Sequence, residues 1–138
     1  MVDRLALSVP CKAEYVGTVR MALAHAANNA GFDIDAIDDI KVAVSEACTN
    51  VILHSESCES SNFDVIVELD EERLTIVVKD CGTGFGPDEY VPPVLGETGE
   101  SGLGIFIIKE LMDEVDICSE PGKGTKIRMS KVLQNLNG

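Results

Sequence analysis

The spacing of hydrophobic and polar positions predicts five elements in the first 80 residues. Apolar residues recur every three to four positions in residues 12–30 and 33–55, which predicts two helices, and Gly31 is suited to end the first. Apolar and polar residues alternate instead in three shorter runs, which predicts strands at residues 4–9, 63–70 and 73–80. Only two residues separate the last two strands, so they are expected to form a hairpin.

A segment rich in glycine and proline, residues 81–102, interrupts this pattern. Its composition excludes a packed helix or strand, and a loop of this length in a compact domain is usually functional. Residues 103–115 then predict a helix, and residues 115–120 and 125–133 predict two more strands. The full order of elements is β-α-α-β-β-α-β-β.

This order predicts an α+β two-layer sandwich. Strands and helices do not alternate regularly, so a doubly wound parallel sheet is disfavoured. We expect a mixed, mostly antiparallel sheet with helices on one face. A chain of 138 residues without repeats or linkers is expected to form one domain, residues 1–138.

Composition and charge narrow the range of partners. No apolar run reaches the roughly 18 residues of a membrane span, and the first residues make a poor signal peptide, so we expect a cytoplasmic protein without a membrane partner. The net charge of −13 argues against binding nucleic acid and permits a basic protein partner, although solubility alone also explains it. Five cysteines without CxxC spacing indicate reduced thiols rather than zinc or disulfides, with Cys48 buried and inert.

Three polar features are candidates for chemistry, and the first is the pair Glu46 and Asn50. Four residues along a helix place the two side chains about 40° apart on one face. A carboxylate and an amide oxygen there could hold a hard cation, or one could act on a hydroxyl while the other binds the metal. The alternative is a solvent-exposed pair at the edge of the apolar stripe.

The second and third features are glycine motifs around the long loop. Asp80 ends a strand, and Gly82 and Gly84 follow, which allows close approach of a ligand to the backbone or forms a simple tight turn. Gly102 and Gly104 precede and open the next expected helix, whose free N–H groups favour an anion. Together the features indicate a nucleotide site that meets an adenine amine, phosphates and magnesium.

These motifs resemble the GHKL ATPase superfamily: its N box (Glu46, Asn50), its DxGxG box, its GxG box, and a final box at residues 122–127. VSEACTN and LMDEV narrow the resemblance to the serine-protein kinases and anti-sigma factors of the RsbW and SpoIIAB type. The resemblance covers nearly the whole chain. It implies the Bergerat fold, use of ATP and Mg²⁺, phosphorylation of a serine on a STAS-domain anti-anti-sigma protein, sequestration of a sigma factor, and a homodimer.

The resemblance also implies a role for each site residue. Glu46 would accept or orient the proton of the attacking serine, and Asn50 would bind Mg²⁺. Asp80 would bind the adenine amine, with Thr125 near it. The remaining implied contacts are backbone ones: Gly82 and Gly84 line the base pocket, and Gly102, Leu103 and Gly104 face the phosphates.

Two alternatives stay open at this point. One is an ATP-binding partner switch without catalysis, and the other is a related GHKL kinase or phosphatase activator in a different STAS pathway. The segment from Phe85 to Ser101 contains four acidic residues and no Lys or Arg, so phosphate transfer could be slow. Lys109, in the next helix, is expected to lie on its solvated face.

Overall fold

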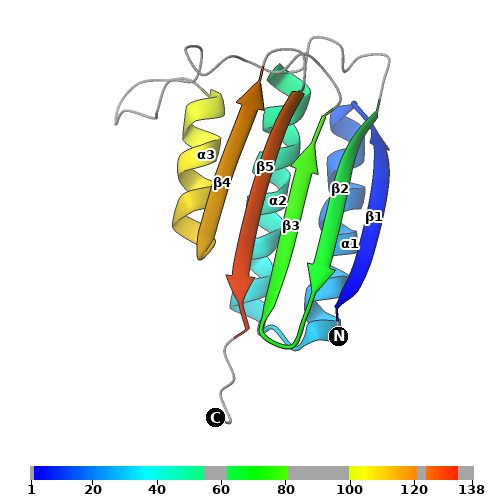
Figure 1. The fold of residues 1–138 in the computed structure, drawn as a ribbon, viewed down its shortest axis with the longest axis vertical. Coiled ribbons are helices and arrows are strands. Elements are labelled where there is room, and N and C mark those ends of the chain that lie inside the picture. Colours follow the sequence, from blue (N-terminus) through cyan, green and yellow to red (C-terminus); the bar gives the residue numbers. More distant parts are fainter. Residues whose placement is uncertain (1, 55–61, 81–99, 121–123, 134–138) are drawn as a thin grey trace.

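The computed structural model describes residues 2–54, 62–80, 100–120 and 124–133 (Figure 1). The described strands are β1 (Asp3–Pro10), β2 (Asn62–Leu69), β3 (Arg73–Lys79), β4 (Glu114–Glu120) and β5 (Gly124–Val132). The described helices are α1 (Val16–Ala30), α2 (Ile34–His54) and α3 (Glu100–Leu111), with a short 3-10 turn at Ala13–Tyr15 before α1. The predicted order of elements is confirmed.

The five strands form one sheet in the order β1-β2-β3-β5-β4, and every pairing is antiparallel. The three helices lie side by side on one face of this sheet (Figure 1). The predicted two-layer α+β sandwich is therefore confirmed. The last strand, β5, is inserted between β3 and β4, so the sheet joins segments from both halves of the chain.

The hydrophobic core lies between the sheet and the helices. The strand register puts alternate apolar residues of neighbouring strands on the helix-facing side, where they are buried. The stripe of α2 predicted from the sequence meets them, and its members Val44, Ala47, Cys48 and Val51 are at most 1% exposed. The strand residues of this core include Val65, Val67, Ile76, Val78, Ile127 and Met129.

The predicted boundaries are wrong at both ends of α3. The helix was expected at residues 103–115, but it begins at Glu100, inside the segment expected to be a loop, and ends at Leu111. Apolar periodicity continues past Leu111, yet the N–H of Asp113 donates to the carbonyl of Ser130 on β5 at 2.9 Å. Pairing with the sheet thus replaces the helical hydrogen bond and starts β4.

The hairpin between β2 and β3 lacks the usual Asn-Gly, and a side chain stabilises its turn instead. Asp70 Oδ1 accepts hydrogen bonds from the backbone N–H groups of Glu72 and Arg73, at 2.7 and 2.8 Å. These two hydrogen bonds hold the pKa of the Asp70 carboxyl below its usual value. Asp70, the residue after β2, therefore stabilises the turn in place of the usual Asn-Gly sequence.

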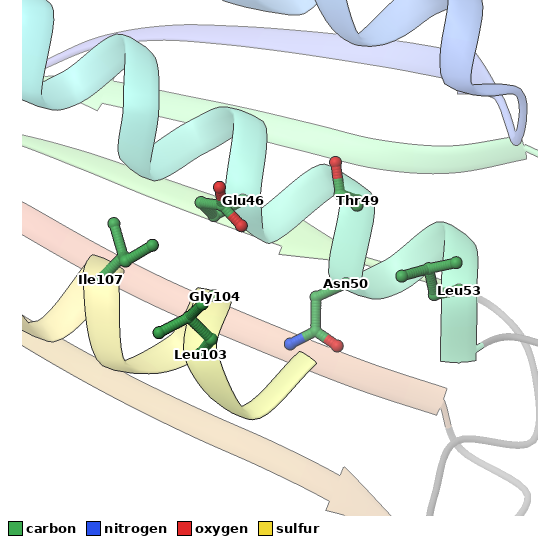
Figure 2. Close-up of a pocket in the computed structure, with 7 residues that line it drawn as sticks. All are labelled: Glu46, Thr49, Asn50, Leu53, Leu103, Gly104 and Ile107. Carbon is green, nitrogen blue, oxygen red and sulfur yellow. The ribbon is translucent and has the colours of Figure 1, made fainter. Parts of the chain in front are cut away.

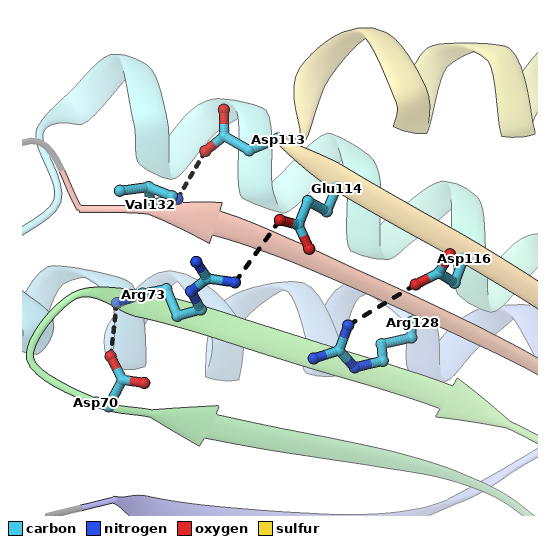
Figure 3. Close-up of polar contacts among 7 residues, drawn as sticks. All are labelled: Asp70, Arg73, Asp113, Glu114, Asp116, Arg128 and Val132. Carbon is cyan, nitrogen blue, oxygen red and sulfur yellow. Dashed lines mark hydrogen bonds and ion pairs between the residues drawn. The ribbon is translucent and has the colours of Figure 1, made fainter.

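Polar contacts tie the β4 edge of the sheet together (Figure 3). Asp113 Oδ2 accepts the backbone N–H of Val132 at 2.6 Å. The ion pairs Arg73–Glu114 and Arg128–Asp116 have N···O distances of 3.8 Å, and all four side chains are at least 36% exposed. Exposed pairs of this kind contribute only about 0–1 kcal/mol each.

The cysteines follow the sequence expectation in part. Cys48 is a free thiol in the core, and its burial raises its pKa to about 12, so it is inert as predicted. Cys118 is free and exposed. Cys11, however, is disulfide-bonded, so the expectation of reduced thiols throughout is wrong: an odd count of cysteines without CxxC spacing does not exclude a disulfide.

No helix in the described part of the chain has both the length and the apolar composition needed to cross a bilayer.

Candidate functional site

A pocket of about 240 Å³ lies between α2 and α3 (Figure 2). Helix α2 supplies four of its lining residues and α3 supplies three. The lining residues are Glu46, Thr49, Asn50, Leu53, Leu103, Gly104 and Ile107. Four of the sequence-predicted site residues, Glu46, Asn50, Leu103 and Gly104, therefore share one pocket.

Glu46 and Asn50 lie on one face of α2, as their spacing predicted. Asn50 is only 4% exposed, so the alternative of a solvent-exposed pair is wrong for this residue. Glu46 is half-buried. Thr49 and Leu53 also line the pocket and were missed, although they lie three and seven positions after Glu46, on the same helical face.

The side-chain amide of Asn50 is able to bind a ligand in this pocket. Its Nδ2 is buried, and none of the residues that the structure describes accepts a hydrogen bond from it. A buried polar group without a partner costs about 1–3 kcal/mol, so this N–H donor favours an acceptor such as a phosphate oxygen. The other atom of the amide, Oδ1, is of the type that binds Mg²⁺, since Mg²⁺ takes oxygen ligands from proteins.

The donors in this pocket suit Mg²⁺ better than a metal ion that takes all of its ligands from protein side chains. Among the described residues, no group of three or more His, Cys, Asp or Glu side chains could hold a metal ion. Mg²⁺ is usually held by one or two protein ligands together with waters and substrate phosphates. The single amide oxygen of Asn50 meets that pattern.

Helix α3 forms the opposite wall of the pocket, which Gly104 lines. Gly102 lies in the first turn, where backbone N–H groups have no acceptor within the helix. Gly104 lies two residues further and faces Glu46 so closely that a Cβ there would be 2.8 Å from Glu46 Oε2. Ile107, which sequence analysis missed, follows Gly104 by three positions and lines the same wall.

Asp80 and Thr125 form a second buried unit at the ends of β3 and β5. The N–H of Asp80 donates to the carbonyl of Thr125 at 3.0 Å, and the N–H of Thr125 donates to Asp80 Oδ1 at 2.9 Å. They are 5% and 3% exposed. This reciprocal pair fixes the carboxylate, but neither residue lines the pocket between α2 and α3.

The structure describes only some of the remaining residues singled out in the sequence. Lys109 is exposed on α3, as expected. Gly82, Gly84 and the acidic segment up to residue 99 lie outside the described residues.

Comparison with known proteins gives one family match. The model of the histidine kinase-like ATPase domain family matches residues 9–131. Serine-protein kinase RsbW of Bacillus cereus is 36% identical over 141 residues, covering 96% of this chain and 86% of the relative. The RsbW kinase of Bacillus thuringiensis matches with the same identity and coverage.

Solved structures show a similar fold. The RsbU and RsbW domains of a Mycobacterium tuberculosis protein align with a TM-score of 0.72 at 20% identity, covering 96% of this chain and 33% of that one. The histidine kinase domain of a blue-light activated kinase from Erythrobacter litoralis aligns with a TM-score of 0.58 at 22% identity, covering 90% and 61%.

Proposed function

This chain belongs to the histidine kinase-like ATPase domain family and, within it, to the RsbW serine-protein kinases; from that premise we propose the reaction and the partners that its pocket serves. The chain is an ATP-dependent protein-serine kinase and anti-sigma factor. Its substrate is a serine on a STAS-domain anti-anti-sigma protein, and its second partner is a sigma factor. The buried Asn50 amide beside the Glu46 carboxylate is the observation that carries this proposal.

In the proposed complex, the nucleotide extends from Asp80 to the start of α3. Asp80 accepts a hydrogen bond from the adenine amine, with Thr125 holding the carboxylate in place. Gly82 and Gly84 allow the base to approach the backbone. Gly102, Leu103 and Gly104 present backbone to the phosphates, and Asn50 provides an oxygen ligand to Mg²⁺, which neutralises phosphate charge when bound.

Glu46 acts on the protein substrate. Its carboxylate accepts the proton of the serine hydroxyl while the serine oxygen bonds to the γ-phosphorus. The bond from that phosphorus to the β–γ bridging oxygen breaks, and ADP leaves. General-base help of this kind is typically worth about 10²–10⁴-fold, and positioning supplies most of the rest.

We propose that the protein acts as a homodimer in the cytoplasm, where ATP and sigma factors are found, and that residues 1–138 form a single kinase domain. Neither nucleic acid nor a membrane takes part in the proposed reaction.

The test is transfer of labelled phosphate from ATP, with Mg²⁺, to each STAS protein of the same organism. We expect the wild type to label one of them, and Glu46→Gln to lower the rate by about 100-fold or more because the proton acceptor is lost. ATP affinity should stay within about threefold in this variant. Glu110→Gln, the same change at an exposed position of α3, should leave the rate unchanged.

Other outcomes would favour the alternatives. Binding of ATP without label on any STAS protein would support a partner switch without catalysis. Label confined to a STAS protein unconnected with a sigma factor would support a related kinase in another pathway.

A further inference from the structure

We propose that Gly104 is a positioning residue for Glu46: a glycine there lets α3 lie against the carboxylate and fix its place in the pocket. This inference rests on the proposed function, because it assigns to Gly104 an effect on proton transfer. It adds to the backbone contact with phosphates predicted from the sequence, which concerns the nucleotide and not the carboxylate.

The contact itself is closer than any side chain would allow. A Cβ at position 104 would lie 2.8 Å from Glu46 Oε2 and 3.8 Å from both Cβ and Cδ of Glu46. Gly104 is buried, and Figure 2 shows it on α3 opposite Glu46 on α2. The backbone of α3 therefore forms the surface against which the Glu46 side chain rests.

Helical propensity does not explain a glycine at this position. Glycine inside a helix is about 1 kcal/mol less favourable than alanine. Gly104 has no left-handed backbone that would require it, since Gly31 is the one described residue with positive φ. Gly17 of α1 shows the contrast, because a Cβ there would meet nothing within 4 Å.

The packing of α3 determines what would move if a methyl group were added. Ile105 and Ile108 of α3 are 2% and 0% exposed, so the helix is held against the core. The Nζ of Lys131 donates to the carbonyl of Leu111 at 2.7 Å and holds its far end. The atom that a new Cβ would meet is the end of a flexible carboxylate, so the carboxylate would be displaced and the fold would remain.

The first experiment compares Gly104→Ala with Gly17→Ala as a matched control. We expect Gly104→Ala to lower kcat by about 10- to 100-fold, a loss within the range attributed to general-base catalysis. The Kd for ATP should stay within about threefold and the unfolding midpoint near that of the wild type. Gly17→Ala should leave kcat unchanged. A loss of ATP affinity that accounts for the lost rate would overturn the proposal, because the added methyl group would then act through the phosphates and not through Glu46.

A double-mutant cycle tests whether Gly104 acts through Glu46. In a Glu46→Gln background, which already lacks the proton acceptor, Gly104→Ala should lower the residual rate by less than about twofold. Equal losses in both backgrounds would show an independent role for Gly104 and would refute the inference.

A readout without catalysis separates this inference from the proposed function. The ¹³C signal of the Glu46 carboxyl can be observed by NMR in each variant. We expect Gly104→Ala to change its chemical shift and Gly17→Ala to leave it unchanged. An unchanged Glu46 signal in Gly104→Ala would overturn the inference even if the kinase is active, whereas a changed signal in an inactive protein would count only against the proposed function.

Discussion

At the scale of single residues, two buried polar groups of the site differ in how they are satisfied. The N–H of Asp80 donates to the carbonyl of Thr125, and Asp80 Oδ1 accepts the N–H of Thr125, so these groups are satisfied within the fold. The Nδ2 of Asn50 has no acceptor in the described part of the chain. A group of this kind lowers the stability of the free protein, and it is retained where a ligand supplies the missing contact.

This difference predicts opposite effects of Asn50→Leu on stability and on binding. The free energy of unfolding should stay equal or rise by about 1 kcal/mol, because an unsatisfied amide is replaced by an apolar group of similar size. The Mg²⁺-dependent affinity for ATP should fall at least about tenfold. Urea unfolding and calorimetric titration with and without Mg²⁺ measure the two effects.

Ser130→Ala is the matched control for this prediction. Ser130 is 1% exposed, and its Oγ also lacks a described partner, but it is not among the pocket residues. Its replacement should leave ATP affinity unchanged. If Asn50→Leu bound MgATP as tightly as Ser130→Ala does, Asn50 would not be a magnesium ligand.

Cys48 gives a prediction about pH. Burial raises its pKa from 9.0 to about 12, so the folded protein keeps this proton where the unfolded chain loses it. Since stability falls with pH wherever the folded state binds more protons, the stability due to this group should be lost as pH rises above about 9. Cys48→Ala should show a weaker decline between pH 9 and pH 11 in urea unfolding, and an identical decline would contradict the assignment.

At the scale of elements, α3 is held at its C-terminal end by a lysine from β5. The Nζ of Lys131 donates to the carbonyl of Leu111, one of the last groups of the helix, and lies 3.7 Å from Asp39 of α2. The Lys131 side chain is only 16% exposed. A cation in this place satisfies a helix-end carbonyl and complements the helix dipole.

Lys131→Met should therefore destabilise the protein by about 1–3 kcal/mol, because a partly buried carbonyl loses its donor. Lys126→Met, on the same strand at an exposed position, should cost less than about 0.5 kcal/mol. Chemical denaturation of both variants measures the difference. Equal stabilities would mean that the Lys131 contact contributes nothing net.

The elements could be predicted from the sequence wherever local periodicity decides them. The strands β2 and β3 and helix α2 have strong periods, and their bounds agree within one residue. The ends of α3 could not be predicted, because a hydrogen bond between Asp113 and β5 fixes one of them. Glu46 and Asn50 were found by helical spacing, but the contact of Gly104 with Glu46 depends on the packing of α2 against α3, which no local pattern encodes.

At the scale of the whole molecule, the proposed nucleotide contacts come from α2, α3, β5 and the residues that follow β3. A ligand that binds only the folded state stabilises it by about 2.7 kcal/mol at 100 times its Kd. MgATP should therefore raise the unfolding midpoint by several degrees in differential scanning calorimetry, and EDTA should remove much of this increase. Glu46→Gln should retain the increase, because Glu46 serves the transfer step. A midpoint unaffected by MgATP would argue against a nucleotide site.

The insertion of β5 between β3 and β4 has a consequence for biosynthesis. A nascent polypeptide emerging from the ribosome can pair β1, β2 and β3 early, but β4 has no partner until β5 follows it. Thr125, which completes the buried pair with Asp80, belongs to the same late strand. Translation thus delays assembly of the Asp80–Thr125 pair, the proposed adenine contact, until the final strand has left the exit tunnel, and a stalled chain that ends before residue 124 cannot form it.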